Sequence, residues 1–131
     1  MSLVVSKPAR LVFLEAMFGW SPIRELTLRL YKNDRVPTES SGEEDFAEAD
    51  FLGYEAQELK NWKLDSLDPP TVAHEQVGFR SSTDQKEQKI FGYFVTGNAD
   101  KLFWAERFPG GPYSISMAGD EIRIISKFQL E

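Results

Sequence analysis

The sequence predicts a mainly β protein, either an antiparallel β-sandwich or a jelly-roll-like barrel of about seven or eight strands, with a short N-terminal helix. Short apolar runs recur along the chain, turn residues separate them, and helical periodicity is strong only near the N-terminus. The 131 residues include ten Phe, three Trp and four Tyr to fill a core. We therefore expect a single domain over residues 1–131, with a helix at about 7–18 and a β-domain at about 23–131.

The N-terminal segment carries the signals of an amphipathic helix. Ser6 can accept a hydrogen bond as the N-cap residue, and Pro8 lies in the first turn, where its missing N–H is not needed. Leu11, Leu14 and Phe18 follow at i, i+3 and i+7, which places them on one face. We expect this face to pack on the edge of a sheet, and its alternative role is a contact with another chain.

The stretch from Lys89 to Phe108 predicts the central hairpin of the β-domain. Ile90–Thr96 is a run of apolar and β-branched residues of strand length. Gly97–Asp100 supply turn residues, and Leu102–Phe108 follow as the return strand. Because both faces of the first strand are apolar, we expect it to be covered on both sides.

A four-residue turn also predicts the register of this hairpin. Gly92 then faces a small residue, which leaves a shallow space that the side chain of Trp62 could fill. We interpret Glu106 as a strand-end charge near solvent, because lone buried charges are rare. The expected pairs are Thr96 with Lys101, Val95 with Leu102, Phe94 with Phe103, Tyr93 with Trp104, and Gly92 with Ala105.

Alternating apolar and polar residues predict the other strands. The alternation is clearest near the C-terminus, where Ile122, Ile124, Phe128 and Leu130 point inward and Ile125 is the exception. The strands expected outside the hairpin are Ile23–Lys32, Gly53–Trp62, Val72–Arg80, a short strand at Ile115 and Met117, and Glu121–Leu130.

Residues 38–50 form an acidic segment, which Phe46 and Phe51 are expected to anchor to the core. Hard cations such as Ca²⁺ prefer several carboxylate oxygens. The spacing of the acids does not match an EF-hand loop, so we interpret the segment as a solvated loop without a metal site. The acids are Glu39, Glu43, Glu44, Asp45, Glu48 and Asp50.

Residues that commonly carry catalysis are scarce. The chain has no cysteine, and its one histidine, His74, cannot form a histidine cluster for a metal. The net charge of −6 and the lack of a basic run argue against nucleic-acid binding. No apolar stretch approaches the roughly 20 residues that span a bilayer. We expect a protein that is not an enzyme, with no cofactor, no metal, no nucleic-acid partner and no membrane association.

Three segments follow one another in a recognisable order: LYKNDRVPT (30–38), DFAEADFLGYEAQEL (45–59) and GYFVTGNADKLFWAERF (92–108). Together they resemble a family of small uncharacterised proteins from the structural modules of tailed phages and prophages. The resemblance covers roughly residues 8–130, and it implies a β-rich, virion-associated or phage-encoded accessory protein. The family has no assigned activity, so the resemblance implies no site residue.

These observations predict a non-enzymatic structural protein that acts through protein–protein assembly. The helix at 7–18 has more apolar width than one packing stripe needs, so we expect a homo-oligomer with Phe13 or Met17 at or near the contact. Other phage structural proteins are further expected partners. The expected location is the cytoplasm on expression, or the virion.

The alternative function is that of a carbohydrate-binding β-sandwich module, which would stack sugar rings on exposed aromatic side chains. Its candidate residues are Trp20, Trp62 and Trp104. The solvent exposure of these three rings distinguishes the two functions.

Overall fold

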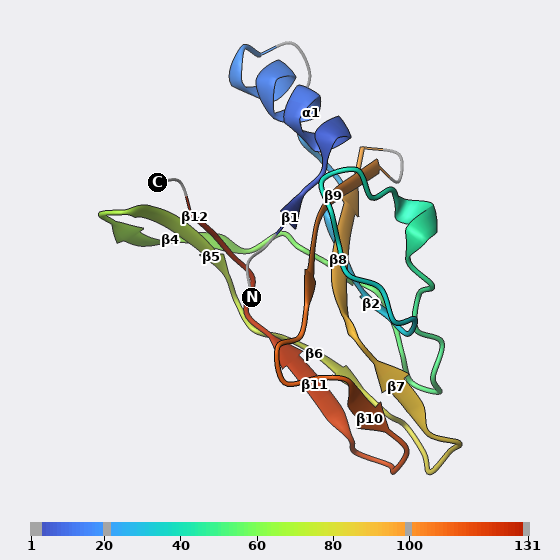
Figure 1. The fold of residues 1–131 in the computed structure, drawn as a ribbon. Coiled ribbons are helices and arrows are strands. Elements are labelled where there is room, and N and C mark those ends of the chain that lie inside the picture. Colours follow the sequence, from blue (N-terminus) through green and yellow to red (C-terminus); the bar gives the residue numbers. More distant parts are fainter. Residues whose placement is uncertain (1–3, 20–21, 99–100, 130–131) are drawn as a thin grey trace.

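The chain folds into antiparallel β-sheets with a short N-terminal helix, which confirms the predicted fold class (Figure 1). The computed structural model describes residues 4–19, 22–98 and 101–129, so Trp20, Ala99, Asp100 and Leu130 lie outside the described residues. The helices are α1 (Lys7–Met17) and the 3₁₀ helix η1 (Glu43–Asp45). The strands are β1 (Val4–Val5), β2 (Thr27–Tyr31), β3 (Gln57–Glu58), β4 (Trp62–Leu67), β5 (Pro70–His74), β6 (Val77–Arg80), β7 (Gln88–Ile90), β8 (Gly92–Gly97), β9 (Lys101–Arg107), β10 (Tyr113–Ile115), β11 (Glu121–Ile124) and β12 (Lys127–Gln129).

The described residues form twelve strands, more than expected, because two expected strands are divided and others, such as β1 and β4, were not expected. Val72–Arg80 is split into β5 and β6, and Glu121–Leu130 into β11 and β12. β5 pairs with β12 whereas β6 pairs with β11, so both segments pass from one sheet to another at the same place. Ile125, the exception to the alternation in the sequence, lies exposed at this bend.

Four sheets share the described strands. The largest has the order β1-β9-β8-β2-β3, and two further pairs are β6–β11 and β7–β10. The fourth sheet, β12-β5-β4, is called the arm below. In Figure 1 the arm reaches away from the other sheets on the left, and α1 projects at the top. The arrangement is sandwich-like, and the described strands do not close into a barrel.

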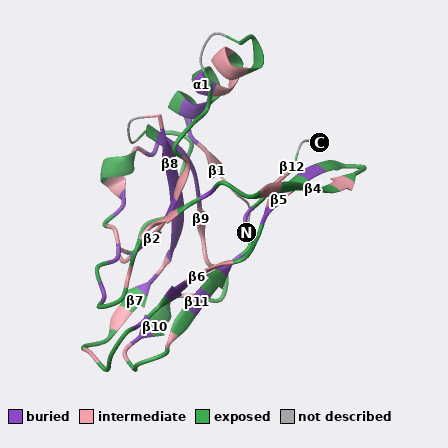
Figure 2. Cartoon of the chain, turned by 180° about the vertical axis from the view of Figure 1, so that it is seen from behind, coloured by how far each residue is buried: buried purple, intermediate pink, exposed green. Residues whose placement is uncertain are grey.

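Strand β8 is buried along its whole length, as predicted (Figure 2). Tyr93 and Val95 lie in the main hydrophobic cluster. Phe94 points to the opposite side, where Tyr31 and Phe46 cover it. The Phe46 and Phe94 rings are stacked with centroids 5.2 Å apart. The central strand is therefore covered on both faces.

The predicted register of the β8–β9 hairpin is wrong by one residue at Thr96 and by two residues from Val95 to Gly92. Gly97 takes part in the ladder, which shortens the turn, and a β-bulge leaves Phe103 without a direct partner. The ring of Phe103 lies edge-on to Phe13 of α1, with centroids 5.7 Å apart. The observed pairs are Gly97 with Lys101, Thr96 with Leu102, Val95 with Trp104, Phe94 with Ala105, Tyr93 with Glu106, and Gly92 with Arg107.

The space beside Gly92 is filled by Tyr31, and not by Trp62 as the sequence suggested. A Cβ atom on Gly92 would lie 2.5 Å from Tyr31 Oη and would also meet the carbonyl oxygen of Glu106. The Tyr31 hydroxyl donates to the carbonyl of Arg35 at 3.0 Å. Burial raises the pKa of Tyr31 to about 12. Glycine is thus required where this phenol crosses β8.

Helix α1 begins where the sequence predicts. The Ser6 hydroxyl accepts a hydrogen bond from the Ala9 N–H at 3.3 Å, as an N-cap residue does. The same hydroxyl donates to the carbonyl of Leu102, and the Ser6 N–H donates to the carbonyl of Phe103 at 3.0 Å. These bonds attach the first turn of the helix to β9.

The face that α1 turns toward the core differs from the prediction. Ala9 and Val12 are buried, and Phe13 packs against the core beside them. The attachment through Ser6 fixes the rotation of the helix, and the small side chain of Ala9 permits a close approach to the sheet. The prediction that Leu11, Leu14 and Phe18 form the packing stripe is therefore wrong, because all three are exposed.

Candidate functional site

The outer face of α1, formed by Leu11, Leu14, Met17 and Phe18, is an exposed apolar surface. Each of these side chains is more than half exposed, and Met17 reaches 73%. Contiguous exposed apolar side chains mark interaction sites more often than isolated ones do. Met17, one of the two expected contact residues, is therefore accessible to a partner.

Phe13, the other expected contact residue, is partly buried within its own chain. Its ring lies edge-on to Phe103 at 5.7 Å and to Phe128 at 5.9 Å between centroids. Two such contacts place it between α1, β9 and β12. Phe13 therefore holds the helix against the sheets. This role does not depend on a partner at the outer face of the helix.

A chain of aromatic rings continues from Phe13 into the arm. Phe128 lies 5.6 Å from Trp104, Trp104 lies 6.2 Å from Trp62, and Trp62 lies 5.3 Å from His74, all between ring centroids. These rings join α1, β9 and the arm into one packed unit. The position of the arm relative to the helix is thus set by the core.

The tryptophans do not form a platform for a sugar ring in the described structure. Trp104 is only 4% exposed. Trp62 is half-buried, and its ring is inclined at 66° to that of Trp104 in an edge-on contact. Trp20, the third candidate, lies outside the described residues. The described rings are therefore neither coplanar nor both exposed.

The arm carries a second exposed apolar surface, which the sequence analysis missed. Much of the arm is exposed (Figure 2). Leu64, Leu67 and Val72 are exposed, and Leu67 reaches 80%. Strand β4 was not predicted, because Lys63 and Asp65 interrupt its apolar residues. The signal that could have revealed it is the alternation of these two charged residues with Trp62, Leu64 and Ser66.

His74 is buried, with both ring nitrogens engaged. Nε2 accepts a hydrogen bond from the Asn61 N–H at 3.0 Å, and Nδ1 lies 2.8 Å from the carbonyl oxygen of Glu75. This arrangement requires the tautomer that carries its proton on Nδ1. The histidine therefore connects β5 to the start of β4 and presents no free base to a substrate.

Glu106 lies near the end of β9 and is partly exposed, as the sequence predicted, but its carboxylate is also hydrogen-bonded within the chain. The Tyr93 hydroxyl donates to Glu106 Oε1 at 2.9 Å. Burial, and next the charge of Glu106, raise the pKa of Tyr93 far above its usual value. Trp104 Nε1 and Ser126 Oγ lie beside this hydroxyl and lower its pKa, although their geometry makes no full hydrogen bond. The side chains of Tyr93, Glu106, Trp104 and Ser126 thus bring together polar atoms from β8, β9 and the residue before β12.

Residues 39–50, called the acidic strap below, cross the large sheet with most of their carboxylates paired. Arg10 donates to Glu39 at 2.8 Å, and this bond lowers the pKa of Glu39. The hydrogen bonds from Lys32 and then Gln88 lower the pKa of Asp50. No three acidic or histidine side chains converge on a metal position within the described ranges. The ion pairs are Glu39 with Lys7 and Arg10, Asp45 with Arg35, Glu48 with Arg29, and Asp50 with Lys32.

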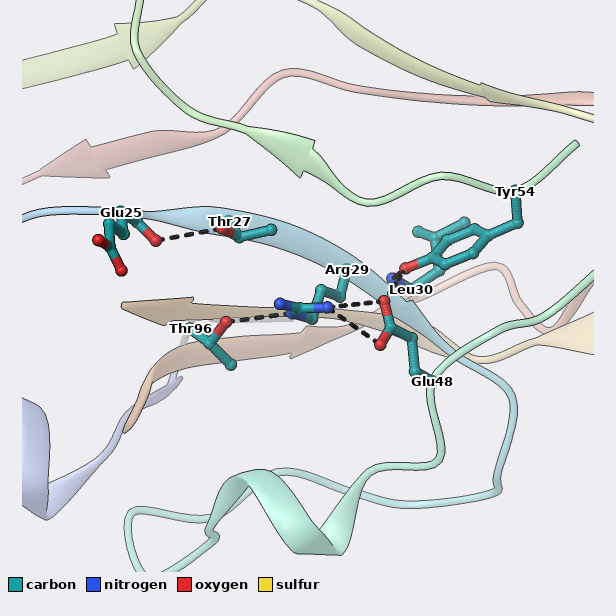
Figure 3. A network of polar contacts seen from close by, with 7 residues as sticks. All are labelled: Glu25, Thr27, Arg29, Leu30, Glu48, Tyr54 and Thr96. Atoms are coloured by element: carbon teal, nitrogen blue, oxygen red, sulfur yellow. Dashed lines mark hydrogen bonds and ion pairs between the residues drawn. The ribbon is translucent and has the colours of Figure 1, made fainter. Parts of the chain in front are cut away.

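The strap also takes part in a network of polar contacts around Arg29 (Figure 3). Arg29 Nη1 lies 3.1 Å from both carboxylate oxygens of Glu48, and Arg29 Nε donates to Thr96 Oγ1 at 3.1 Å. The Tyr54 hydroxyl donates to Glu48 at 2.6 Å and accepts from the Leu30 N–H at 3.2 Å. Burial, and next the bond to Glu48, raise the pKa of Tyr54 well above its usual value. Every group has a structural partner, so the network fixes the strap to β2 and β8.

The helices of the described residues are too short or too polar to cross a membrane. Comparison of the chain with protein-family models, with curated proteins and with solved structures gives no match. The resemblance to phage and prophage proteins therefore stays a prediction from the sequence. The candidate site consists of the outer face of α1 and the exposed side chains of the arm.

Proposed function

We propose that this protein is a non-enzymatic assembly protein that acts by protein–protein contact, as an accessory component of a phage or prophage particle. The outer face of α1 is the observation that carries the proposal. The phage setting is supported by the three sequence segments at 30–38, 45–59 and 92–108.

The outer face of α1 is suited to binding because the helix is held rigidly beneath it. Ser6 attaches the first turn to β9, and the ion pair of Arg10 with Glu39 attaches it to the acidic strap. Phe13 and Val12 pack the inner side of the helix. A partner therefore meets an ordered surface, and association does not require the helix to form first. The proposed first partner is another copy of the chain.

The proposal is tested by replacing two residues of this surface, Leu14→Asp and Met17→Asp, in the full chain. Both side chains are exposed, so the fold should be retained while the apolar surface is interrupted. Val36→Asp with Ile125→Asp is the matched control, because these residues are equally exposed but lie elsewhere. Light scattering after size-exclusion chromatography measures the mass at about 100 µM, where weak association is detectable.

We expect an oligomer for the wild-type chain and for the control, and a lower mass for the variant of the outer face of α1. Circular dichroism establishes that each variant is folded. A monomeric wild-type chain, or a variant whose mass equals that of the wild type, contradicts the proposal.

A further inference from the structure

Strand β4 is the outer strand of the arm, and only one of its edges has a partner strand in the described part of the chain. The partner is β5, which separates β4 from β12. An edge strand presents backbone N–H and C=O groups that can pair with a strand of another chain. β4 runs over six residues, long enough for a short ladder.

Up to the bulge that follows Leu64, the side chains of β4 alternate between an apolar and a charged face. Asp65 lies on the charged face, because its carboxylate is 3.4 Å from Lys127 Nζ across the arm. Lys63 shares that face and has no ion pair within the described residues. The cross-strand rows are Leu64, Val72 and Phe128 on the apolar face, and Lys63, Ala73 and Lys127 on the charged face.

We propose that β4 pairs with β4 of a second copy of this chain, antiparallel about a two-fold axis at Leu64. This inference rests on the proposed function, because it specifies how two copies meet. In this register Lys63 of each copy faces Asp65 of the other, so two opposite-charge pairs form. The two Leu64 side chains meet on the apolar face and continue its row across a six-stranded sheet.

The charges of β4 favour this register over the two symmetric registers whose axes lie one residue away. An axis at Lys63 would set two lysines opposite each other, and an axis at Asp65 would set two carboxylates opposite each other. Like charges directly opposite destabilise a strand pair. The bulge between Leu64 and Ser66 bends the strand, and bulges and edge charges both oppose open-ended pairing. Of these three registers, only the one with its axis at Leu64 pairs opposite charges, and an isologous pairing closes as a dimer.

The test uses two charge reversals, Lys63→Asp and Asp65→Lys, each in the full chain. Either reversal alone sets like charges opposite each other twice in the symmetric dimer. When the two variants are mixed, the heterodimer regains an opposite-charge pair at both positions. Both reversals are made in a chain that also carries Leu14→Asp and Met17→Asp, so that the outer face of α1 does not contribute to the measured association.

Sedimentation velocity from about 10 to about 500 µM measures the association of each variant and of the equimolar mixture. We expect a dimer for the chain with only the α1 substitutions, about tenfold or more weaker association for each reversal, and recovery in the mixture. Lys86→Asp makes the same charge change on an exposed loop and should leave the dimer intact.

Recovery in the mixture separates pairing from folding, because a misfolded arm could not be rescued by a second defective arm. The inference is overturned if the chain with only the α1 substitutions is monomeric over this range. It is also overturned if the mixture associates no better than the separate variants. Neither result bears on the outer face of α1, which the comparison of wild-type and α1-substituted chains tests by itself.

Discussion

The hairpins β8–β9 and β4–β5 are both antiparallel but lie in opposite environments. Every residue of β8 is buried, whereas most of β4 is exposed. β8 has apolar residues on both faces, whereas Lys63 and Asp65 interrupt the apolar residues of β4. β8 lies between β9 and β2, while β4 has a neighbour on one side only. The residues of a strand and the elements packed around it therefore both determine whether it is buried.

The difference between the hairpins comes largely from the acidic strap. The strap places Phe46 on Phe94, and the ion pairs of Asp45 with Arg35 and of Glu48 with Arg29 hold it over the large sheet. No comparable segment covers the outer part of the arm in the described chain. The surfaces left for a partner are thus the ones without a strap.

The largest expected effect is that of Phe94→Ala in the covered hairpin. The side chain is 1% exposed and stacked on Phe46, so we expect a loss of about 3–5 kcal/mol in the free energy of unfolding. Leu64→Ala in the arm is the comparison and should change stability by no more than about 0.5 kcal/mol. Urea unfolding measures both at a concentration too low for association. A loss below about 1 kcal/mol for Phe94→Ala would show that β8 is not central.

A smaller effect is expected for Gly92→Ala in the same hairpin. The new methyl group would lie 2.5 Å from Tyr31 Oη and against the backbone of Glu106, which cannot move aside. We expect a loss of about 1–3 kcal/mol from overpacking. Gly42→Ala is the control, because its methyl group would meet the flexible side chain of Glu44. Equal stability of the two variants in urea unfolding would contradict this account of Gly92.

Low pH should weaken the attachment of the acidic strap, which covers the central hairpin. The pKa of Glu39 and that of Asp50 are lowered in the folded chain, by the bonds from Arg10 and Lys32 respectively. A lowered folded pKa gives stability that is present above the unfolded pKa and is lost as the pH falls through the folded pKa. We expect the wild-type chain to lose more stability between about pH 5 and pH 3 than Glu39→Gln with Asp50→Asn. Parallel losses in urea unfolding would mean that these ion pairs do not stabilise the strap.

The smallest expected effect is that of Ca²⁺ on the strap. Most of its carboxylates face a lysine or arginine of the chain, so they are not arranged around a common cation. We expect no tight Ca²⁺ binding in calorimetric titration. A micromolar affinity that disappears in the variant Glu43→Gln, Glu44→Gln, Asp45→Asn would contradict this expectation.

Elements with strong local signals could be predicted from the sequence. Ser6 and Pro8 mark the start of α1, and the apolar run at 90–96 marks a strand covered on both faces. The register of the hairpin could not be predicted, because a bulge at Phe103 keeps apolar residues on both faces just as the expected register does. In the observed register Phe103 packs against Phe13, which is far away in the sequence.

The candidate site was predicted only in part. The excess apolar width of α1 and the exposure of Met17 follow from its spacing along the chain. Which face of the helix stays outside depends on the bonds of Ser6 to β9, which join residues almost a hundred positions apart. Strand β4 of the arm was missed because the expected strand Gly53–Trp62 ended at the residue where β4 begins.

The sequence by itself determined the β class, the N-terminal helix, the central strand and the scarcity of catalytic groups, because these depend on residue type and local spacing. The tertiary structure alone decided the register of β9, the exposed face of α1, the filling of the space at Gly92 by Tyr31, and the pairing of four of the six acidic residues of the strap. These features depend on contacts between segments far apart in the chain, where several arrangements satisfy the same local pattern. Packing and charge pairing in three dimensions select one of them.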